Sequence, residues 1–223
     1  MKIAVLFSGG KDSVRAVHWC LQKKYKVKYL VTIISENPDS YMFHTCNIDK
    51  IELVAEALGI PIIIKKSSGK KEEELKDLEE VLKLLDIDTV VAGGIASNYQ
   101  KSRIENLCEK LKLNCIFPFW NIDNEKFIRD TIDLNFDVRI VGVFSDGLDK
   151  SWLGRKIDYN TLKELKELNK KYGLSLVGEG GEFETIVLNG PIFKKRIKII
   201  QAKRIWDSIT NSGRYIIEKA ILT

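Results

Sequence analysis

The first half of the chain alternates apolar runs with segments of helical periodicity. Strands are predicted at 2–7, 27–34, 61–65, 88–92 and 113–117. Helices are predicted between them, at 13–23, 48–58, 71–85 and 98–111. This alternation is typical of right-handed βαβ units, which build a parallel sheet with helices on both faces. Because such sheets bind ligands beyond the carboxyl ends of their strands, the loops that follow the strands are the candidate functional segments.

The pattern changes at Phe117-Pro118-Phe119-Trp120-Asn121. A helix is then predicted at 124–134, a strand at 138–144 and a Lys/Glu-rich helix at Tyr159–Lys171. From Glu184 onward the pattern predicts mostly strands, with a hairpin around Asn211-Ser212-Gly213. We therefore expect an α/β domain over residues 1–120 and a smaller C-terminal α+β domain over residues 121–223.

The loop after the first predicted strand is Ser8-Gly9-Gly10-Lys11-Asp12-Ser13, and a helical segment follows it. A strand that ends in a glycine turn and leads into a helix N-terminus is an anion site, because backbone N–H groups there have no intrahelical partner. Gly9 and Gly10 let the backbone approach a ligand closely. Lys11 supplies a mobile cation, and Ser8 and Ser13 supply hydroxyl donors. Asp12 suits a phosphate site only if a divalent cation lies between carboxylate and phosphate.

These residues make a nucleotide polyphosphate with Mg²⁺ the first hypothesis for the loop. It is not a Walker A loop, which has four residues between its first glycine and Gly-Lys-Ser/Thr. It is not a dinucleotide fingerprint either, because Gly9 and Gly10 are adjacent and no third glycine follows at the required spacing. The alternative is a plain Gly-Gly turn whose charges only face solvent.

Two further loops follow predicted strands. Residues 35–46 hold His44 next to an aromatic and apolar run, which suits either contact with a nucleotide or substrate or packing on the domain. Gly93-Gly94 again brings backbone close to the sheet edge, and Ser97 or Asn98 can cap the helix that follows. Tyr99 and Arg103, four residues apart, share one face of that helix and can hold a base or a carboxylate. An ordinary amphipathic surface helix is the alternative.

The second half holds an acidic glycine-rich motif, Gly178-Glu179-Gly180-Gly181-Glu182-Phe183-Glu184-Thr185. Three glutamates in a glycine turn are costly if they are buried unpaired, and they are not needed for folding if they are exposed. Glu179, Glu182 and Glu184 therefore suit Mg²⁺, an ammonium ion or a cationic substrate group. An acidic surface turn is the alternative.

Composition and charge indicate a soluble globular protein. The 223 residues are 44% hydrophobic and 30% charged, and no apolar run approaches the roughly 18 residues that span a bilayer. The chain begins directly with a core-type strand, so no signal peptide is expected. The net charge is +5, but Lys and Glu are interspersed, and Phe193-Lys194-Lys195-Arg196 is expected to be surface charge. We expect no membrane partner and no stable nucleic-acid partner.

The four cysteines, Cys20, Cys46, Cys108 and Cys115, form no Cys-x-x-Cys pair and have no zinc spacing. Such a pattern favours buried free thiols in a reducing compartment. The expected location is therefore the cytoplasm.

Ser8–Ser13 resembles the PP-loop, Ser-Gly-Gly-x-Asp-Ser, of the N-type ATP pyrophosphatases. With the other motifs it is similar to one family within them, that of diphthine–ammonia ligase. The discriminating piece is Glu-Gly-Gly-Glu-Phe-Glu-Thr at 179–185; Phe119, where family members often have Leu, is a small departure. The remaining matching stretches are Met42-Phe43-His44-Thr45, Gly94–Glu105, Pro118-Phe119-Trp120, Gly147-Leu148 and Leu153-Gly154-Arg155.

The resemblance implies a HUP-type α/β domain that binds ATP, followed by a smaller α+β domain that completes the substrate cleft. It also implies an amide-forming ligase with ATP and Mg²⁺. ATP would adenylylate the carboxylate of diphthine on translation elongation factor two. Ammonia, present as ammonium, would then displace AMP to give diphthamide, with AMP and pyrophosphate as products. Alternatives are a PP-loop enzyme that modifies transfer RNA, and a non-catalytic regulator that binds adenine nucleotides.

With this family in view, each candidate residue takes a role. Asp12 is assigned to the metal, and Trp120 or Trp152 to a cation–π face for the quaternary ammonium of diphthine. Catalytic roles are assigned to Lys11, Arg103, Glu179, Glu182 and Glu184. Nucleotide contacts are assigned to Ser8, Gly9, Gly10, Lys11, Asp12, Ser13, His44, Gly93, Gly94 and Tyr99. The sequence leaves open a homodimer, the source of ammonia, the surface on which the elongation factor docks, and a paralogue with a different acceptor.

Overall fold

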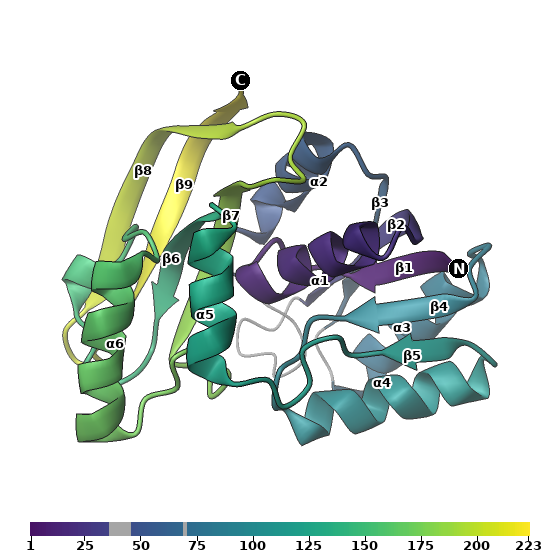
Figure 1. Ribbon diagram of the computed structural model, residues 1–223, viewed down its shortest axis with the longest axis horizontal. Helices are drawn as coiled ribbons and strands as arrows, with labels where there is room; N and C mark the ends of the chain where they lie inside the picture. The colour runs from purple at the N-terminus through teal and green to yellow at the C-terminus, as the bar shows by residue number, and fades with distance from the viewer. Residues whose placement is uncertain (36–45, 69–70) are drawn as a thin grey trace. The chain divides into compact units, whose positions relative to one another are not determined.

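The computed structural model describes residues 1–35, 46–68 and 71–223 (Figure 1). The chain divides into two compact units. The first contains Met1–Ser8, Asp12–Ile48 and Gly59–Asn121. The second contains Ile122–Thr223 together with two short segments from the first half, Gly9–Lys11 and Asp49–Leu58.

The first unit is built on a five-stranded parallel sheet of order β3-β2-β1-β4-β5. Its strands are β1 Lys2–Leu6, β2 Lys26–Ser35, β3 Ile62–Ser67, β4 Thr89–Ala92 and β5 Asn114–Ile116. Its helices are α1 Lys11–Gln22, α3 Lys71–Lys83 and α4 Asn98–Lys110. The strand order reverses between β1 and β4, so the loops after these two strands leave the sheet at its topological switch point. The predicted α/β fold with a HUP-type sheet is confirmed.

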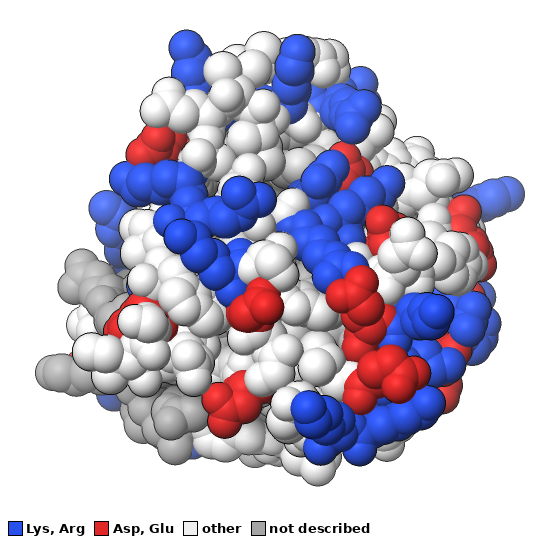
Figure 2. All heavy atoms as spheres, turned by 90° about the vertical axis from the view of Figure 1, so that its left-hand side faces the viewer, with Lys and Arg blue, Asp and Glu red and all other residues white. Residues whose placement is uncertain are grey.

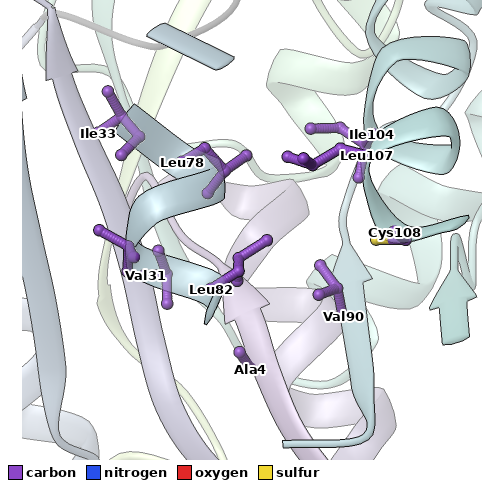
Figure 3. Close-up of a cluster of buried hydrophobic side chains, with 10 residues drawn as sticks. Ala4, Val31, Ile33, Leu78, Leu82, Val90, Ile104, Leu107 and Cys108 are labelled. Carbon is purple, nitrogen blue, oxygen red and sulfur yellow. The ribbon is translucent and has the colours of Figure 1, made fainter. Parts of the chain in front are cut away.

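Side-chain alternation along the strands creates the core of this unit. Ala4, Val31, Ile33 and Val90 point to the face that α3 and α4 cover. In Figure 3 these side chains meet a row of apolar helix residues, namely Leu78 and Leu82 of α3 and Ile104, Leu107 and Cys108 of α4. Neighbouring strand residues such as Ile3, Val5 and Leu30 are buried on the opposite face, where Figure 1 shows α1.

The second unit contains a four-stranded antiparallel sheet of order β7-β6-β9-β8. Its strands are β6 Asp137–Val143, β7 Phe183–Asn189, β8 Ile197–Asp207 and β9 Ser212–Leu222. Its helices are α2 Ile51–Leu58, α5 Asn124–Asp133 and α6 Tyr159–Tyr172, with short 3₁₀ turns η1 Ile48–Lys50 and η2 Lys150–Trp152. The expected α+β unit and the β8–β9 hairpin are confirmed.

Local sequence signals explain where the helices of the second unit begin and end. The Asp123 carboxylate accepts a hydrogen bond from Lys126 N at 2.6 Å and caps α5. Asp158 caps α6 in the same way through Thr161 N at 2.8 Å. Gly173, with φ of 73°, ends α6 in the left-handed conformation that favours glycine.

The charged surface is mixed. Figure 2, which looks onto the side where β8, β9 and α6 lie, shows Lys and Arg interspersed with Asp and Glu. Lys194, Lys195 and Arg196 are exposed, as expected for surface charge. Lys195 pairs with Glu56 at 3.4 Å, and Arg196 pairs with Asp137 at 3.2 Å.

All four cysteines are free thiols, as predicted. Cys20 and Cys108 are buried, whereas Cys46 and Cys115 are partly buried. Burial raises the pKa of the Cys20 thiol to about 12. Within the ranges that the structure describes, no helix has the length and apolar character needed to cross a membrane.

Candidate active site

The glycine loop after β1 leads into α1 earlier than the sequence suggests. The helix begins at Lys11 and not at residue 13, so Lys11, Asp12 and Ser13 form its first turn. Ser8 N donates a hydrogen bond to Ser13 Oγ at 3.2 Å, and the two hydroxyl oxygens are also 3.2 Å apart. Gly9, with φ of 74°, takes the left-handed conformation that glycine adopts without strain. The loop is therefore preshaped around a helix N-terminus, as the anion-site hypothesis requires.

Lys11 is anchored to the acidic glycine-rich motif and its neighbours. Its backbone N donates to Thr185 Oγ1 at 3.1 Å, and its Nζ donates to the Val177 carbonyl. The same Nζ lies 5.5 Å from the centre of the Phe183 ring. Only 3% of Lys11 is exposed. The description of Lys11 as a mobile cation is therefore wrong for this structure, in which the ammonium group is fixed by a carbonyl and an aromatic face.

The segment Gly9–Lys11 runs along β7, the edge strand of the antiparallel sheet. Besides the Lys11 contacts, Val187 N of β7 donates to the Gly9 carbonyl at 3.0 Å. This bond satisfies a backbone donor on a strand edge that would otherwise be open. Two motifs that are far apart in the sequence, Ser8–Ser13 and Gly178–Thr185, are therefore in direct contact through Lys11 and Thr185.

Glu182 shapes the acidic loop from within. Its Oε1 accepts a hydrogen bond from Ser175 N at 2.9 Å, and its Oε2 accepts one from Gly180 N at 2.8 Å. Gly178 and Gly181 have φ of 72° and 84°, so the turn needs glycine at both positions. Both carboxylate oxygens of Glu182 thus hold the loop backbone, and its catalytic role stays a prediction.

We expect Glu182→Ala to lower the free energy of unfolding by about 1–3 kcal/mol, because two backbone donors lose their acceptor. Chemical denaturation of the purified variant measures this loss. Glu182→Gln keeps one carbonyl oxygen at nearly the same place, so it is expected to recover roughly half of the lost stability. Equal stability of wild type and Glu182→Ala would contradict the structural role.

The other two glutamates of the motif belong to different elements: Glu184 to strand β7 and Glu179 to the loop before it. Phe183 and Thr185 both contact Lys11. Because side chains alternate along a strand, Glu184 projects from the opposite face of β7. The structure therefore does not place the Glu184 carboxylate on the Lys11 side. Glu179 lies in the partly exposed loop before β7.

The loop after β4 contributes two glycines with different surroundings. A Cβ atom added at Gly93 would lie 2.5 Å from the backbone C and O of Asp12 and 2.8 Å from Ser13 N. At Gly94 the nearest atom would be Phe117 Cε1, at an ordinary 3.6 Å. Gly93 therefore lets the end of β4 approach the first turn of α1, and Gly94 has no comparable constraint.

The start of α4 is capped as predicted: Ser97 Oγ accepts a hydrogen bond from Gln100 N at 3.4 Å. Arg103 Cζ lies 4.5 Å from the centre of the Tyr99 ring, so the two residues share a helix face as expected. Tyr99 also packs against the hydrophobic core below α4. In the structure the guanidinium and the ring stack on each other.

The two indoles assigned to a substrate cation already lie beneath cations of this chain. Lys101 Nζ is 4.4 Å from the centre of the Trp120 ring, and Arg155 Cζ is 4.6 Å from that of Trp152. A substrate ammonium would have to displace one of these contacts. His44, which the sequence assigns to nucleotide contact, lies outside the described residues.

Comparison with known proteins decides the family. A model of the diphthamide synthase N-terminal domain matches residues 1–115, and one of the diphthamide synthase C-terminal domain matches residues 123–223. The chain belongs to the diphthamide synthase family. The resemblance read from the motifs is therefore confirmed.

Individual relatives of this diphthamide synthase family member carry the name diphthine–ammonia ligase. The mouse protein is 34% identical over 93% of this chain and 86% of its own length. The human protein is 34% identical over 88% of this chain and 82% of its own length. Among solved structures, a protein of Methanocaldococcus jannaschii described as a predicted subunit of tRNA methyltransferase aligns with a TM-score of 0.48. That alignment has 21% identity and covers 88% of this chain and 99% of the other.

Several contacts of this family member were not anticipated from its sequence. The sequence marks Thr185 and Phe183 only as parts of the acidic motif, and Val177 precedes that motif. Their alternation with Glu184 along a strand was the signal that could have placed them on one face. The contact with the Val177 carbonyl could not be predicted, because every residue has a backbone carbonyl and residue type does not indicate which one accepts a hydrogen bond.

Proposed function

We propose that this protein is an ATP-dependent ligase that converts diphthine on translation elongation factor two into diphthamide. Ammonia is the nitrogen donor, and AMP and pyrophosphate are the products. The single observation that carries the proposal is the contact between the PP-loop and the family's discriminating motif. The backbone N of Lys11 and its side chain both bind residues at or next to Gly178–Thr185.

The reaction we propose has two steps. A carboxylate oxygen of diphthine attacks the α-phosphorus of ATP, the bond to the bridging oxygen breaks, and pyrophosphate leaves. The lone pair of ammonia then attacks the carbonyl carbon of the acyl-adenylate, the C–O bond to AMP breaks, and the amide remains after loss of a proton. Both steps develop negative charge on phosphate oxygens, which fixed donors at a helix N-terminus stabilise.

The chain's residues fit the nucleotide in specific ways. The first turn of α1, at the end of β1, supplies the helix N-terminus for a pyrophosphate group, and Ser8 and Ser13 supply hydroxyls beside it. Lys11 is the first residue of that turn, and its Nζ donates a hydrogen bond to the Val177 carbonyl. We assign this ammonium group to the charge of the phosphates. Gly93, Gly94 and Tyr99 are assigned to the nucleoside side, and Arg103 to the reacting carboxylate.

We assign Mg²⁺ to Asp12 together with phosphate oxygens of the substrate. Within residues 1–35, 46–68 and 71–223, no three His, Cys, Asp or Glu side chains gather in a way that could hold a metal. Mg²⁺ often uses one or two carboxylates plus substrate phosphates, so Asp12 on the first turn of α1 is a sufficient protein ligand. The ion would neutralise the leaving pyrophosphate.

Glu179 and Glu184 are assigned to the quaternary ammonium of diphthine, because carboxylates attract a cation that has no N–H donors. Glu182 supports them by holding the loop. Since the acceptor is a translation factor and the four cysteines are free, we propose a cytoplasmic location. A homodimer remains part of the proposal to be checked by light scattering.

The test is a complete reaction with purified protein. α-Labelled ATP, ammonium, Mg²⁺ and elongation factor bearing diphthine are expected to give labelled AMP and an amidated factor of slightly lower mass. Omitting either the factor or ammonium should prevent the amide, and chelating Mg²⁺ with EDTA should abolish AMP formation. AMP that appears only with transfer RNA, or nucleotide binding without turnover, would overturn the proposal.

A further inference from the structure

A buried carboxylate lies on the core-facing side of α3. Glu74 stands one helical turn before Leu78, which packs into the core in Figure 3, and so shares its face. Only 2% of Glu74 is exposed. Its Oε1 has no hydrogen-bond partner among the residues that the structure describes. Since buried carboxylate oxygens are normally satisfied by donors or cations, this atom points to a ligand.

A second buried polar atom lies on the face of the sheet that α3 covers. Ser67 ends β3, is 3% exposed, and its Oγ likewise has no partner within the described part of the chain. Ile63 of β3 packs against the core beneath α3, so Ser67, four residues later, projects toward that helix. The next residue, Ser68, donates its hydroxyl to Glu73, which ties this end of the strand to the first turns of α3.

The ion pairs between β3 and α3 show which residue of the strand lies opposite which turn of the helix, and so locate Ser67 relative to Glu74. Lys65 Nζ of β3 lies 3.2 Å from Glu80 Oε2 and 3.7 Å from Asp77 Oδ1 of α3. Strand and helix run in opposite directions here, so two residues further along β3, about 6.6 Å, correspond to about one turn back along α3. Ser67 is therefore level with Glu74, and both belong to the carboxyl end of the sheet.

We propose that Glu74 and Ser67 form a binding site for the ammonium ion. The inference rests on the proposed function, which consumes ammonia. Ammonium combines a positive charge with four N–H donors in a small volume, so it satisfies a carboxylate oxygen and a hydroxyl oxygen at once. The loops of Ser8 and Gly93 leave the same carboxyl edge of the sheet, so ammonium held here is on the edge where the first unit binds its ligands.

Glu182 of the acidic motif is a poorer candidate for binding ammonium than Glu74. Both oxygens of Glu182 already accept backbone hydrogen bonds. Among the described residues no donor reaches Glu74 Oε1, and an ammonium ion would supply one together with a positive charge.

Ammonium binding can be measured without catalysis. Ammonium chloride, exchanged for sodium chloride at constant ionic strength, is expected to raise the Tm of the wild-type protein because it binds the folded state. The increase should vanish in Glu74→Gln and persist in Glu73→Gln, a matched change one residue away. No ammonium-specific increase in the wild type, or its full retention in Glu74→Gln, would overturn the proposal.

Kinetics supply the second measurement. Glu74→Gln is expected to raise the KM for ammonium by about 10- to 100-fold, the range that a hydrogen bond to a charged group commands. Its KM for ATP should stay within about twofold of wild type, and hydroxylamine, a neutral nucleophile, should still trap the acyl-adenylate at the wild-type rate. Ser67→Ala should raise the KM for ammonium by a smaller factor.

The two proposals fail in different ways. If the wild type makes no amide and no hydroxamate, the proposed function is wrong, and the Tm measurement still decides whether Glu74 binds ammonium. If the wild type makes the amide but Glu74→Gln weakens only ATP, or changes neither KM, the ammonium site is wrong and the proposed function stands.

Discussion

Replacing Gly93 by alanine is expected to reduce AMP formation at least about 100-fold, because a displacement of about 1 Å at a positioned group has that effect. The added Cβ would lie 2.5 Å from backbone atoms of Asp12 and 2.8 Å from Ser13 N. These are backbone atoms in the first turn of α1, which cannot rotate away as a flexible side chain would. The helix start, and with it the proposed anion site, must shift.

The same substitution should lower the free energy of unfolding by about 1–3 kcal/mol, the usual cost of overpacking. Gly94→Ala is the matched control for stability, since its Cβ would meet the Phe117 ring at an ordinary 3.6 Å. Thermal unfolding of the two variants side by side measures the difference. Equal Tm values would show that β4 and α1 are not packed as closely as the structure has them.

Replacing Lys11 by methionine is expected to slow AMP formation by about 10²- to 10³-fold, the loss typical of removing one donor that stabilises transition-state charge. Methionine keeps most of the volume and the apolar stem, so the packing against Phe183 is largely retained. What disappears is the charge and the hydrogen bond to the Val177 carbonyl. The rate of AMP release at saturating ATP measures the contribution of Lys11 to catalysis.

The stability of Lys11→Met separates anchoring from catalysis. A buried carbonyl that loses its donor costs about 1–3 kcal/mol, so the variant should unfold at a lower temperature than wild type. Thr185→Val removes the acceptor of the Lys11 backbone N and leaves the ammonium group in place. We expect it to lower the Tm while AMP formation falls much less. If Lys11→Met is less stable but turns over ATP normally, Lys11 is only a structural anchor.

The alternation of strands and helices was predictable because it depends on short-range periodicity. The bounds of β1, β2, β4, α4 and α5 agree with the predicted segments to within about two residues, the usual uncertainty of helix ends. Caps such as Ser97 are equally local, since a side-chain oxygen reaches a backbone N–H three residues away. The β8–β9 hairpin was predictable from its turn residues, Asn211-Ser212-Gly213.

The sequence by itself thus determined the loop after β1, its helix N-terminus and its likeness to a PP-loop, because all of these are properties of about twelve consecutive residues. Only the tertiary structure decided that Lys11 is bound to Thr185 and Val177, residues 174 and 166 positions away. It also decided that Gly93 and not Gly94 meets α1, that Glu182 holds its own loop, and that Glu74 and Ser67 are both buried. Contacts between distant residues depend on how strands pair and helices pack, and local periodicity carries no record of which donor meets which acceptor.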